Sequence, residues 1–361
     1  MIYMKTDPGV PAKNSSFGAI GRSVRRSKQT AKRPAGIAPI LVLAPLVAAV
    51  FTATACAAPP PQTIAPPKGL NLGSTSFFDG FGRQSPGWTV IEYDRYEALD
   101  SINGPGGAAN PYFQGTKINV AVALTQVVYT SAWRPLGGHV AFSAALPVVD
   151  FLRSSFSSAS PVKLANNGLG VGDLVWGPIY QSKVFTKDGR PKFVWRAQLI
   201  ISSPTGGLNS AKDINQGAGY WAINPYVTFS YFPTDKIEVS NRFNYQYNFA
   251  GTRFSDPPPI PRLRYRNGQA GQIVYDNFAT SYAISKHVNL GVNGYVLEQL
   301  NSDRTNGATV PHSIEEELYL GPGMRVRFDD ANSVNLNSYM KVISKDAVSG
   351  LQLNMQFVHR L

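Results

Sequence analysis

Histidine is the first candidate for chemistry in this sequence, because imidazole can act as a general base or as a metal ligand. The chain has four histidines and one cysteine. His139 and Ser143 stand four residues apart, which would place them on one face of a strand, as a hydrolase could require. Four residues along a strand span about 13 Å, which is beyond hydrogen-bond reach. The other histidines, His287, His312 and His359, are widely separated. We therefore predict no catalytic residue, no metal site and no cofactor.

A second set of polar side chains alternates with apolar ones in the last third of the chain. Its members are Glu238, Arg242, Asn244, Gln246, Glu315, Glu317, Arg325, Arg327, Gln352 and Asn354. In each segment these side chains share one face of the expected strand, and the opposite face is apolar. Two explanations stay open for this polar face. The side chains satisfy one another inside the protein, or they line a path that selects a solute.

The elements that would carry these side chains are strands of about ten or more residues, apolar on one face and polar on the other. The segments lie near 88–99, 117–130, 138–149, 171–185, 191–203, 219–232, 236–249, 271–285, 287–300, 313–328, 332–343 and 350–361. Their connections alternate between short and long, as in bacterial barrels whose short turns face the periplasm. The sequence therefore predicts an all-β fold, a transmembrane antiparallel β-barrel of about 12 strands. A soluble β-sandwich or β-helix is the alternative.

An export signal precedes the strands. Met1–Gly36 contains eight basic residues and one acid, and Ile37–Phe51 is apolar but interrupted by prolines. Small residues follow, ending in Ala55-Cys56-Ala57, so we predict a cleaved signal peptide over residues 1–57. The alternative is a lipoprotein signal in which Cys56 carries the lipid. Residues 58–87 form a segment rich in proline and glycine, and residues 88–361 form the barrel.

The net charge of +12 would suggest nucleic acid as a partner. Most of the excess belongs to the basic start of the signal, and the remaining Lys and Arg residues are dispersed rather than clustered with aromatics. We expect no nucleic-acid partner. The low charged fraction, 16%, fits strands that turn one face to lipid. The expected partners are the lipid bilayer, the barrel-assembly machinery and an apolar small-molecule solute, and the expected location is the bacterial outer membrane.

Two further features bear on the lumen of the barrel. Twelve strands enclose a narrow interior, and Leu70–Gly82, which is rich in aromatics and glycine, could lie inside it as a plug. Pro178, Pro225 and Pro322 fall inside expected strands, where each removes a ladder hydrogen bond. They are expected to mark bulges or interface positions; the alternative is a gap in the wall through which an apolar ligand leaves sideways.

Several motifs resemble one known family. They are Gly69-Leu-Asn-Leu-Gly-Ser-Thr-Ser-Phe-Phe-Asp-Gly-Phe, Gly170-Val-Gly-Asp-Leu-Val-Trp-Gly-Pro, Trp221-Ala-Ile-Asn-Pro-Tyr-Val-Thr-Phe-Ser-Tyr-Phe-Pro, Gly294-Tyr-Val-Leu-Glu-Gln-Leu and Gly321-Pro-Gly. Together they are similar to the meta-pathway phenol-degradation family, from about Gly69 to the end. The resemblance implies an outer-membrane channel or transporter for small apolar, phenol-like compounds, and it carries over no catalytic residue. The chain departs from the family in ending with His359-Arg-Leu rather than with an aromatic residue.

Two other functions remain as alternatives. An outer-membrane lipid or ester hydrolase would depend on His139 or His312. A structural or adhesive barrel would concentrate its function in loops such as Gly251–Gly268.

Overall fold

The computed structural model describes residues 70–253 and 266–361, and most of its residues lie in long strands. These strands are β1 (Gly87–Ile102), β2 (Lys117–Thr130), β3 (His139–Ser155), β5 (Leu174–Gln181), β7 (Arg190–Ser203), β8 (Ala222–Tyr231), β9 (Ile237–Asn248), β11 (Ile273–Ala283), β12 (Val288–Gln299), β15 (Glu316–Arg327), β16 (Asn332–Lys345) and β17 (Val348–Arg360). The short elements are β4 (Leu169–Val171), β6 (Phe185–Lys187), β10 (Gly268–Gln269), β13 (Arg304–Thr305), β14 (Ala308–Thr309) and the 3-10 turns η1 (Pro111–Phe113) and η2 (Pro135–Gly137).

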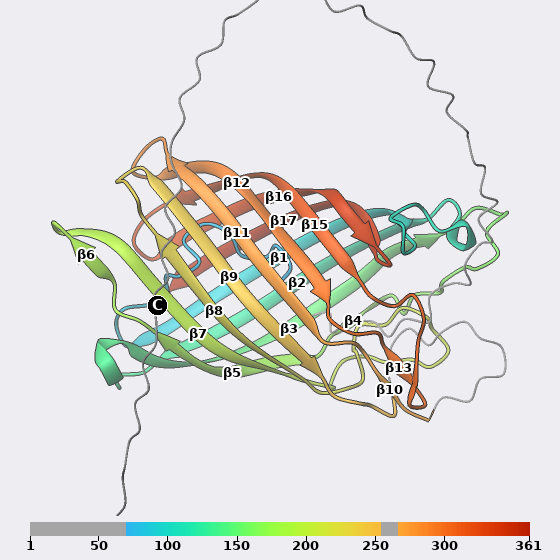
Figure 1. The fold of residues 1–361 in the computed structure, drawn as a ribbon. Coiled ribbons are helices and arrows are strands. Elements are labelled where there is room, and N and C mark those ends of the chain that lie inside the picture. The colour runs from blue at the N-terminus through green and yellow to red at the C-terminus, as the bar shows by residue number, and fades with distance from the viewer. Residues whose placement is uncertain (1–69, 254–265) are drawn as a thin grey trace, which may run out of the picture. The chain divides into compact units, whose positions relative to one another are not determined.

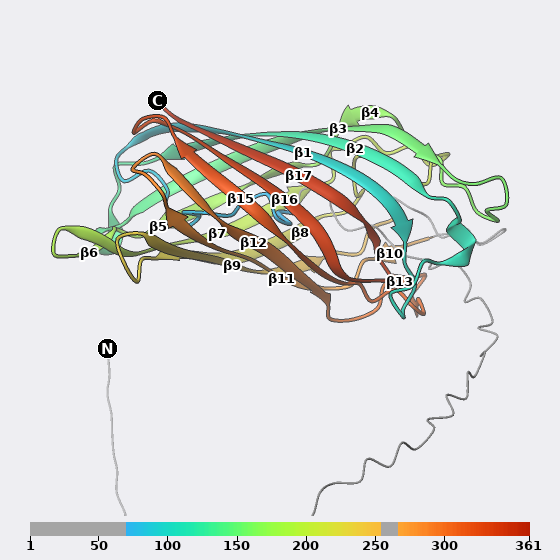
Figure 2. The same ribbon diagram turned by 90° about the horizontal axis from the view of Figure 1, so that it is seen from above.

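The twelve long strands form one closed antiparallel barrel, shown in Figures 1 and 2. Each strand pairs with the next long strand along the chain, and β1 also pairs with β17, so that Thr89 lies opposite Arg360. Closure leaves no open edge in this sheet. The predicted barrel and its strand number are confirmed. The largest boundary difference is at the segment predicted over 138–149, because β3 continues to Ser155. The segment predicted over 171–185 is too long at both ends, since β5 covers only Leu174–Gln181.

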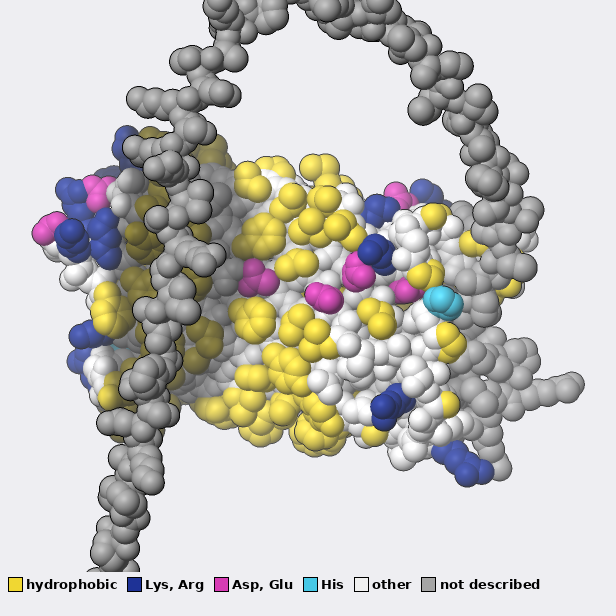
Figure 3. Space-filling model, viewed as in Figure 1, with side chains coloured by type: hydrophobic (Ala, Val, Ile, Leu, Met, Phe, Trp, Pro, Cys, Tyr) yellow, Lys and Arg dark blue, Asp and Glu magenta, His cyan; other side chains and the backbone are white. Residues whose placement is uncertain are grey.

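The outer surface of the barrel is mainly apolar. Leu351 and Leu353 of β17 are 44% and 45% exposed, while Gln352 between them is buried. Figure 3 shows apolar side chains over the middle of one face, with lysine and arginine side chains toward its two ends. A few acids interrupt this surface. Glu92 accepts a hydrogen bond from Thr125, and Asp276 accepts one from Asn241, so each has a polar neighbour on the adjacent strand.

The connections differ between the two ends of the barrel. Residues 232–236, 284–287 and 328–331 make short turns at the end where β1 begins and β17 stops, which we call the short-turn end. The connections from β3 to β5, from β7 to β8 and from β12 to β15 are long and lie at the opposite, long-connection end. None of the helices among residues 70–253 and 266–361 is long and apolar enough to cross a membrane. The predicted signal peptide, Cys56 and most of the predicted loop Gly251–Gly268 lie outside the described residues.

Pro178, Pro225 and Pro322, the three prolines singled out from the sequence, interrupt the ladders without forming bulges. Beside Pro178 the pairing of β5 with β7 skips two residues on each strand and resumes in the same register. The ladders of β8 with β9 and of β15 with β16 are interrupted in the same way at Pro225 and Pro322. The register shifts lie elsewhere, for example between Leu318 and Tyr319. The expectation of bulges at these prolines is therefore wrong, because a missing N–H donor breaks hydrogen bonds without requiring an extra residue.

Candidate functional site

The chain before β1 runs inside the barrel, as part of the blue trace in Figure 1 suggests. We call Leu70–Gly82 the lumen segment. Its backbone is held at Gly73, whose N–H donates to Asn277 Oδ1 at 2.9 Å and whose carbonyl accepts from Tyr339 Oη at 2.7 Å. Gly73 has a φ of +69°, and a Cβ there would lie 2.9 Å from the Tyr339 ring. Glycine is therefore required where the segment crosses this tyrosine.

An ion-pair cluster fixes the lumen segment near its other end. The carboxylate of Asp79 accepts hydrogen bonds from Arg242 Nε at 2.7 Å and Arg242 Nη2 at 2.6 Å, and Arg196 Nη2 lies 3.2 Å away. Thr228 Oγ1 donates to the same carboxylate at 2.9 Å. The ring of Tyr226 stacks against Arg242, with 4.2 Å between the guanidinium carbon and the ring centroid. A buried bidentate ion pair of this kind fixes the position and orientation of the Asp79 carboxylate.

Backbone donors of the lumen segment are also satisfied by strand side chains. Phe78 N donates to Glu238 Oε1 at 2.9 Å, and Gly80 N donates to Ser230 Oγ at 2.9 Å. The carbonyl of Gly80 accepts from Gln181 Nε2 at 3.0 Å. This segment of bends and turns is not paired with a strand, and it thus finds hydrogen-bond partners on the polar part of the barrel wall.

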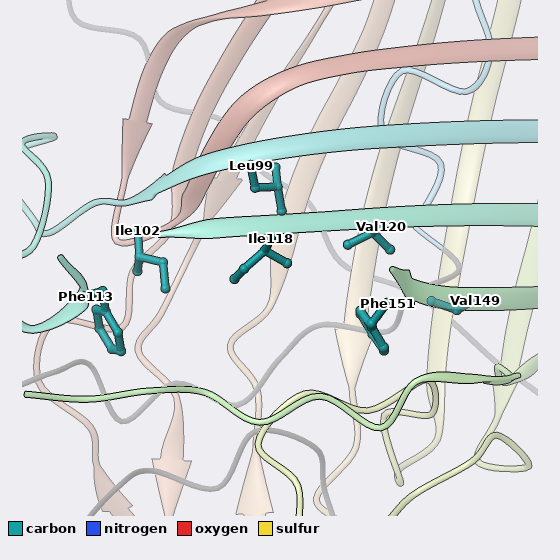
Figure 4. Packing of buried hydrophobic residues seen from close by; sticks show 7 residues of the cluster. All are labelled: Leu99, Ile102, Phe113, Ile118, Val120, Val149 and Phe151. Carbon is teal, nitrogen blue, oxygen red and sulfur yellow. The ribbon is translucent and has the colours of Figure 1, made fainter. Parts of the chain in front are cut away.

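A cavity of about 1030 Å³ remains beside the lumen segment, and its lining residues come from both ends of the barrel. Toward the long-connection end one side of it is apolar. Figure 4 shows the cluster that forms this side, namely Leu99, Ile102, Phe113, Ile118, Val120, Val149 and Phe151. We call these seven residues the apolar wall. It continues along β2, where Val122 and Leu124 also line the cavity.

The apolar wall departs from the expected uniformly polar lumen. In β2 the inward side chains Ile118, Val120, Val122, Leu124 and Val128 are apolar and only Gln126 and Thr130 are polar, so the inward face of this strand is mostly apolar. The polar lumen predicted from β9, β15 and β17 describes only the other side of the barrel. The sequence signal for the apolar wall was the weak alternation of polar and apolar residues in segment 117–130.

The ten predicted lumen residues divide into two groups. Glu315, Glu317, Arg325, Arg327 and Gln352 line the cavity. Glu238 and Arg242 also border it, but they bind the lumen segment, and Asn354 Nδ2 donates to the Gly73 carbonyl at 2.8 Å. Asn244 and Gln246 are fully buried and bond neighbouring strand groups. All ten therefore lie on the inward face of the barrel or at the edge of that face.

A polar cluster borders the apolar wall. Arg95 Nε lies 2.7 Å from Glu97 Oε1, and Arg95 Nη2 donates to Gln352 Oε1 at 2.7 Å. Tyr295 Oη lies 3.2 Å from Glu317 Oε2 and accepts from Gln352 Nε2 at 2.9 Å. Sequence reasoning missed Arg95 and Glu97, because segment 88–99 has charged residues on both faces and so gives no clear inward phase.

Charged side chains line the two ends of the cavity unequally. Among the described residues, the short-turn end has seven basic side chains and three carboxylates, which are Arg83, Arg190, Lys236, Lys286, Arg325, Arg327 and Arg360 against Asp235, Glu238 and Asp330. Toward the long-connection end Arg95 is accompanied by five carboxylates, which are Glu97, Asp213, Glu315, Glu317 and Asp346. Between the two ends Asp79, Arg196 and Arg242 also line the cavity. At the ends themselves the formal excess among the described residues is four positive charges at one and four negative charges at the other.

The histidine and serine considered for a hydrolase do not contact each other. His139 Nδ1 lies 3.0 Å from the Ser131 carbonyl oxygen, while Ser143 Oγ accepts from Gln198 Nε2 at 2.7 Å. His312 is exposed on the chain between β14 and β15. Within the described residues no group of three or more His, Cys, Asp and Glu side chains could hold a metal ion.

Residues 100–357 match the protein family described as "Putative MetA-pathway of phenol degradation". Among solved structures, the COG4313 outer membrane channel from Pseudomonas putida F1 is similar with a TM-score of 0.65 and 14% identity, over 79% of this chain and 98% of that one. The toluene transporter TbuX of Ralstonia pickettii has a TM-score of 0.38 and 10% identity, over 78% and 90% of the chains. The translocator domain of the Neisseria meningitidis autotransporter NalP has a TM-score of 0.42 and 13% identity, over 78% of this chain and 91% of that one. The first likeness shows the fold, and the other two are too distant to carry an argument. No curated protein matches the chain.

Proposed function

We propose that this chain, which belongs to the phenol-degradation family, is an outer-membrane channel for the uptake of small apolar, phenol-like aromatic compounds that feed a degradation pathway. The observation that carries the proposal is the apolar wall inside the lumen. A water-filled porin has a polar interior, whereas a path for an apolar solute needs apolar surface with a few polar groups that fix orientation. Val120 and Phe151 supply the apolar surface, and Arg95 and Gln352 supply the polar groups.

The polar lumen residues have two roles in this proposal. Glu317, Arg325, Arg327, Gln352 and the margin residue Glu315 form the polar side of the solute path. Glu238, Arg242, Asn244, Gln246 and Asn354 hold the lumen segment and the wall behind it. Residues 58–87 then act as a plug that narrows the lumen after residues 1–57 have been removed, and residues 88–361 form the channel. The hydrogen bonds at Gly73 and Asp79 support the holding role. The position of the first group on the cavity lining supports its role in the path.

Uptake by cells with and without the protein tests the proposed function, with phenol, toluene and linear alkanols of similar size as solutes. The double variant Val120→Thr/Val122→Thr keeps side-chain shape but adds two hydroxyls to the apolar wall. We expect it to lower aromatic uptake about threefold or more, since each change weakens apolar contact by up to about 1 kcal/mol. Val127→Thr, on the outward face of the same strand, is the matched control. Equal uptake with and without the protein for every solute would exclude the function.

A further inference from the structure

The opposite charges of the two cavity ends lie in series along the proposed solute path. On β15 both ends are represented by inward residues of a single strand: Glu317 near the long-connection end, and Arg325 and Arg327 near the short-turn end. Glu317 and Arg325 are eight residues apart, which corresponds to about 26 Å along a strand. This exceeds the Debye length of about 8 Å at physiological ionic strength, so a mobile ion meets the two charged zones separately.

The charges are only partly neutralised by pairing. Arg190 pairs with Asp235, and Arg327 Nη1 lies 3.6 Å from Asp330 Oδ1. Arg325 makes neither an ion pair nor a hydrogen bond with a described residue, and its guanidinium carbon stacks 4.4 Å from the centroid of the Phe78 ring. At the opposite end Glu317 accepts a hydrogen bond from Tyr295 rather than forming a salt bridge. Among the described residues that line this end of the cavity, Arg95 is the one basic side chain.

We infer that the lumen is a charge-separated filter that passes neutral small molecules and rejects ions of both signs. Acidic linings favour cations and basic linings favour anions. With both in series, a cation is repelled at the basic end and an anion at the acidic end, while an uncharged solute meets neither barrier. The inference deepens the proposed function by naming the substrate class: uncharged aromatic molecules rather than aromatic carboxylates or ammonium ions.

Ion selectivity of the purified full-length protein in planar bilayers tests the filter. In a KCl gradient the wild-type protein is expected to show a potassium-to-chloride permeability ratio within about threefold of one, and currents that differ between the two voltage polarities. Arg325→Gln/Arg327→Gln removes charge from the basic end, and we expect the ratio to rise about threefold or more. Glu317→Gln/Asp346→Asn removes charge from the acidic end, and we expect the ratio to fall by about the same factor.

Two charge changes outside the lumen serve as controls. Lys187→Gln lies on β6 near the short-turn end, and Glu298→Gln lies on the outward face of β12 near the other end. Neither residue lines the cavity, so neither change is expected to move the ratio. A wild-type ratio far from one overturns the inference. It is also overturned if the two lumen variants shift the ratio in the same direction or leave it unchanged.

Three probes of one shape test the substrate class directly. Benzamide is neutral, benzoate is an anion and benzylammonium is a cation of nearly equal size. Entry into proteoliposomes, corrected for protein-free vesicles, is expected to be at least about tenfold faster for benzamide than for either ion. Equal rates for the three probes contradict the filter. If aromatic uptake by cells fails while the two lumen variants still shift ion selectivity in opposite directions, the proposed function is wrong and the charge filter stands.

Discussion

The two sides of the lumen use opposite chemistry for different purposes. The polar side, formed mainly by β8, β9, β11, β16 and β17, is occupied by the lumen segment through Asn277, Asp79 and its arginines, and Tyr339. The apolar side, formed mainly by β1, β2 and β3, is packed instead against apolar side chains of the long connections, such as Leu164 and Ile214, and it borders the cavity. The comparison teaches that polar residues inside a barrel can bind the chain itself, while the proposed solute path follows the side that offers fewer hydrogen bonds.

Deletion of residues 70–82 tests the polar side most severely. Without the lumen segment more of the lumen is open to solvent and ions, so we expect conductance in planar bilayers to rise about threefold or more. The matched control is the full chain with Leu70→Ala, which keeps the polar contacts of the segment. Unchanged conductance after the deletion would mean that the segment does not restrict the path.

Arg242→Gln tests the anchor of the segment. The change leaves Asp79 buried with Arg196 as its remaining cationic neighbour, and breaking one partner of a buried pair costs about 3–5 kcal/mol. We expect a lower unfolding temperature and noisier single-channel currents, because the segment is held less firmly. In the double variant Arg242→Gln/Asp79→Asn, Arg196 also loses its carboxylate partner, so the unfolding temperature should not recover. A single variant as stable as the wild type would show that the pair does not anchor the segment.

Substitution of Pro178, Pro225 and Pro322 allows the apolar side of the lumen to be compared with the rest of the barrel. Pro178 on β5 neighbours β3 of the apolar side, whereas Pro225 and Pro322 lie on β8 and β15. If a solute leaves sideways through an interrupted ladder, restoring the missing N–H donor with Val should lower aromatic uptake. We expect the effect to be about twofold and largest for Pro178→Val, since restoring one ladder hydrogen bond is worth only about 1 kcal/mol. Unchanged uptake for all three variants would rule out a gap in the wall.

The smallest expected effect is a pH dependence at the acidic end. Burial raises the pKa of Asp346 to about 6, and Asp346 faces His312 and Glu316 in its turn between β16 and β17. Above pH 6 the carboxylate is charged and adds to the acidic end; as the pH falls through 6 it takes up a proton and one negative charge is lost. The potassium-to-chloride permeability ratio should therefore decrease modestly between pH 7 and pH 5. Asp346→Asn should remove this step, and a step that persists in the variant must come from other groups.

The local sequence pattern predicted the strands of the barrel better than it predicted what lies inside the lumen. In β17 the alternation of Leu351, Leu353 and Met355 with amides fixes which face meets lipid, because side chains on a strand point to opposite faces in turn. The same rule indicated that Glu238 and Arg242 point inward. It could not show that Glu238 meets Phe78 and that Arg242 meets Asp79, more than 150 residues away in the chain. Those contacts exist only after the barrel has closed around the lumen segment.

The sequence by itself determined the barrel, its strand number and the inward phase of its regular strands, since these follow from periodicity and turn placement along short stretches of chain. It also indicated that Leu70–Gly82 was a candidate for the lumen. Only the tertiary structure decided which side of the lumen is polar, where the segment is seated and how the charges separate toward the two ends. Those properties depend on which strands become neighbours across the closed barrel, and no local pattern of Arg95, Val120 or Glu317 carries that information.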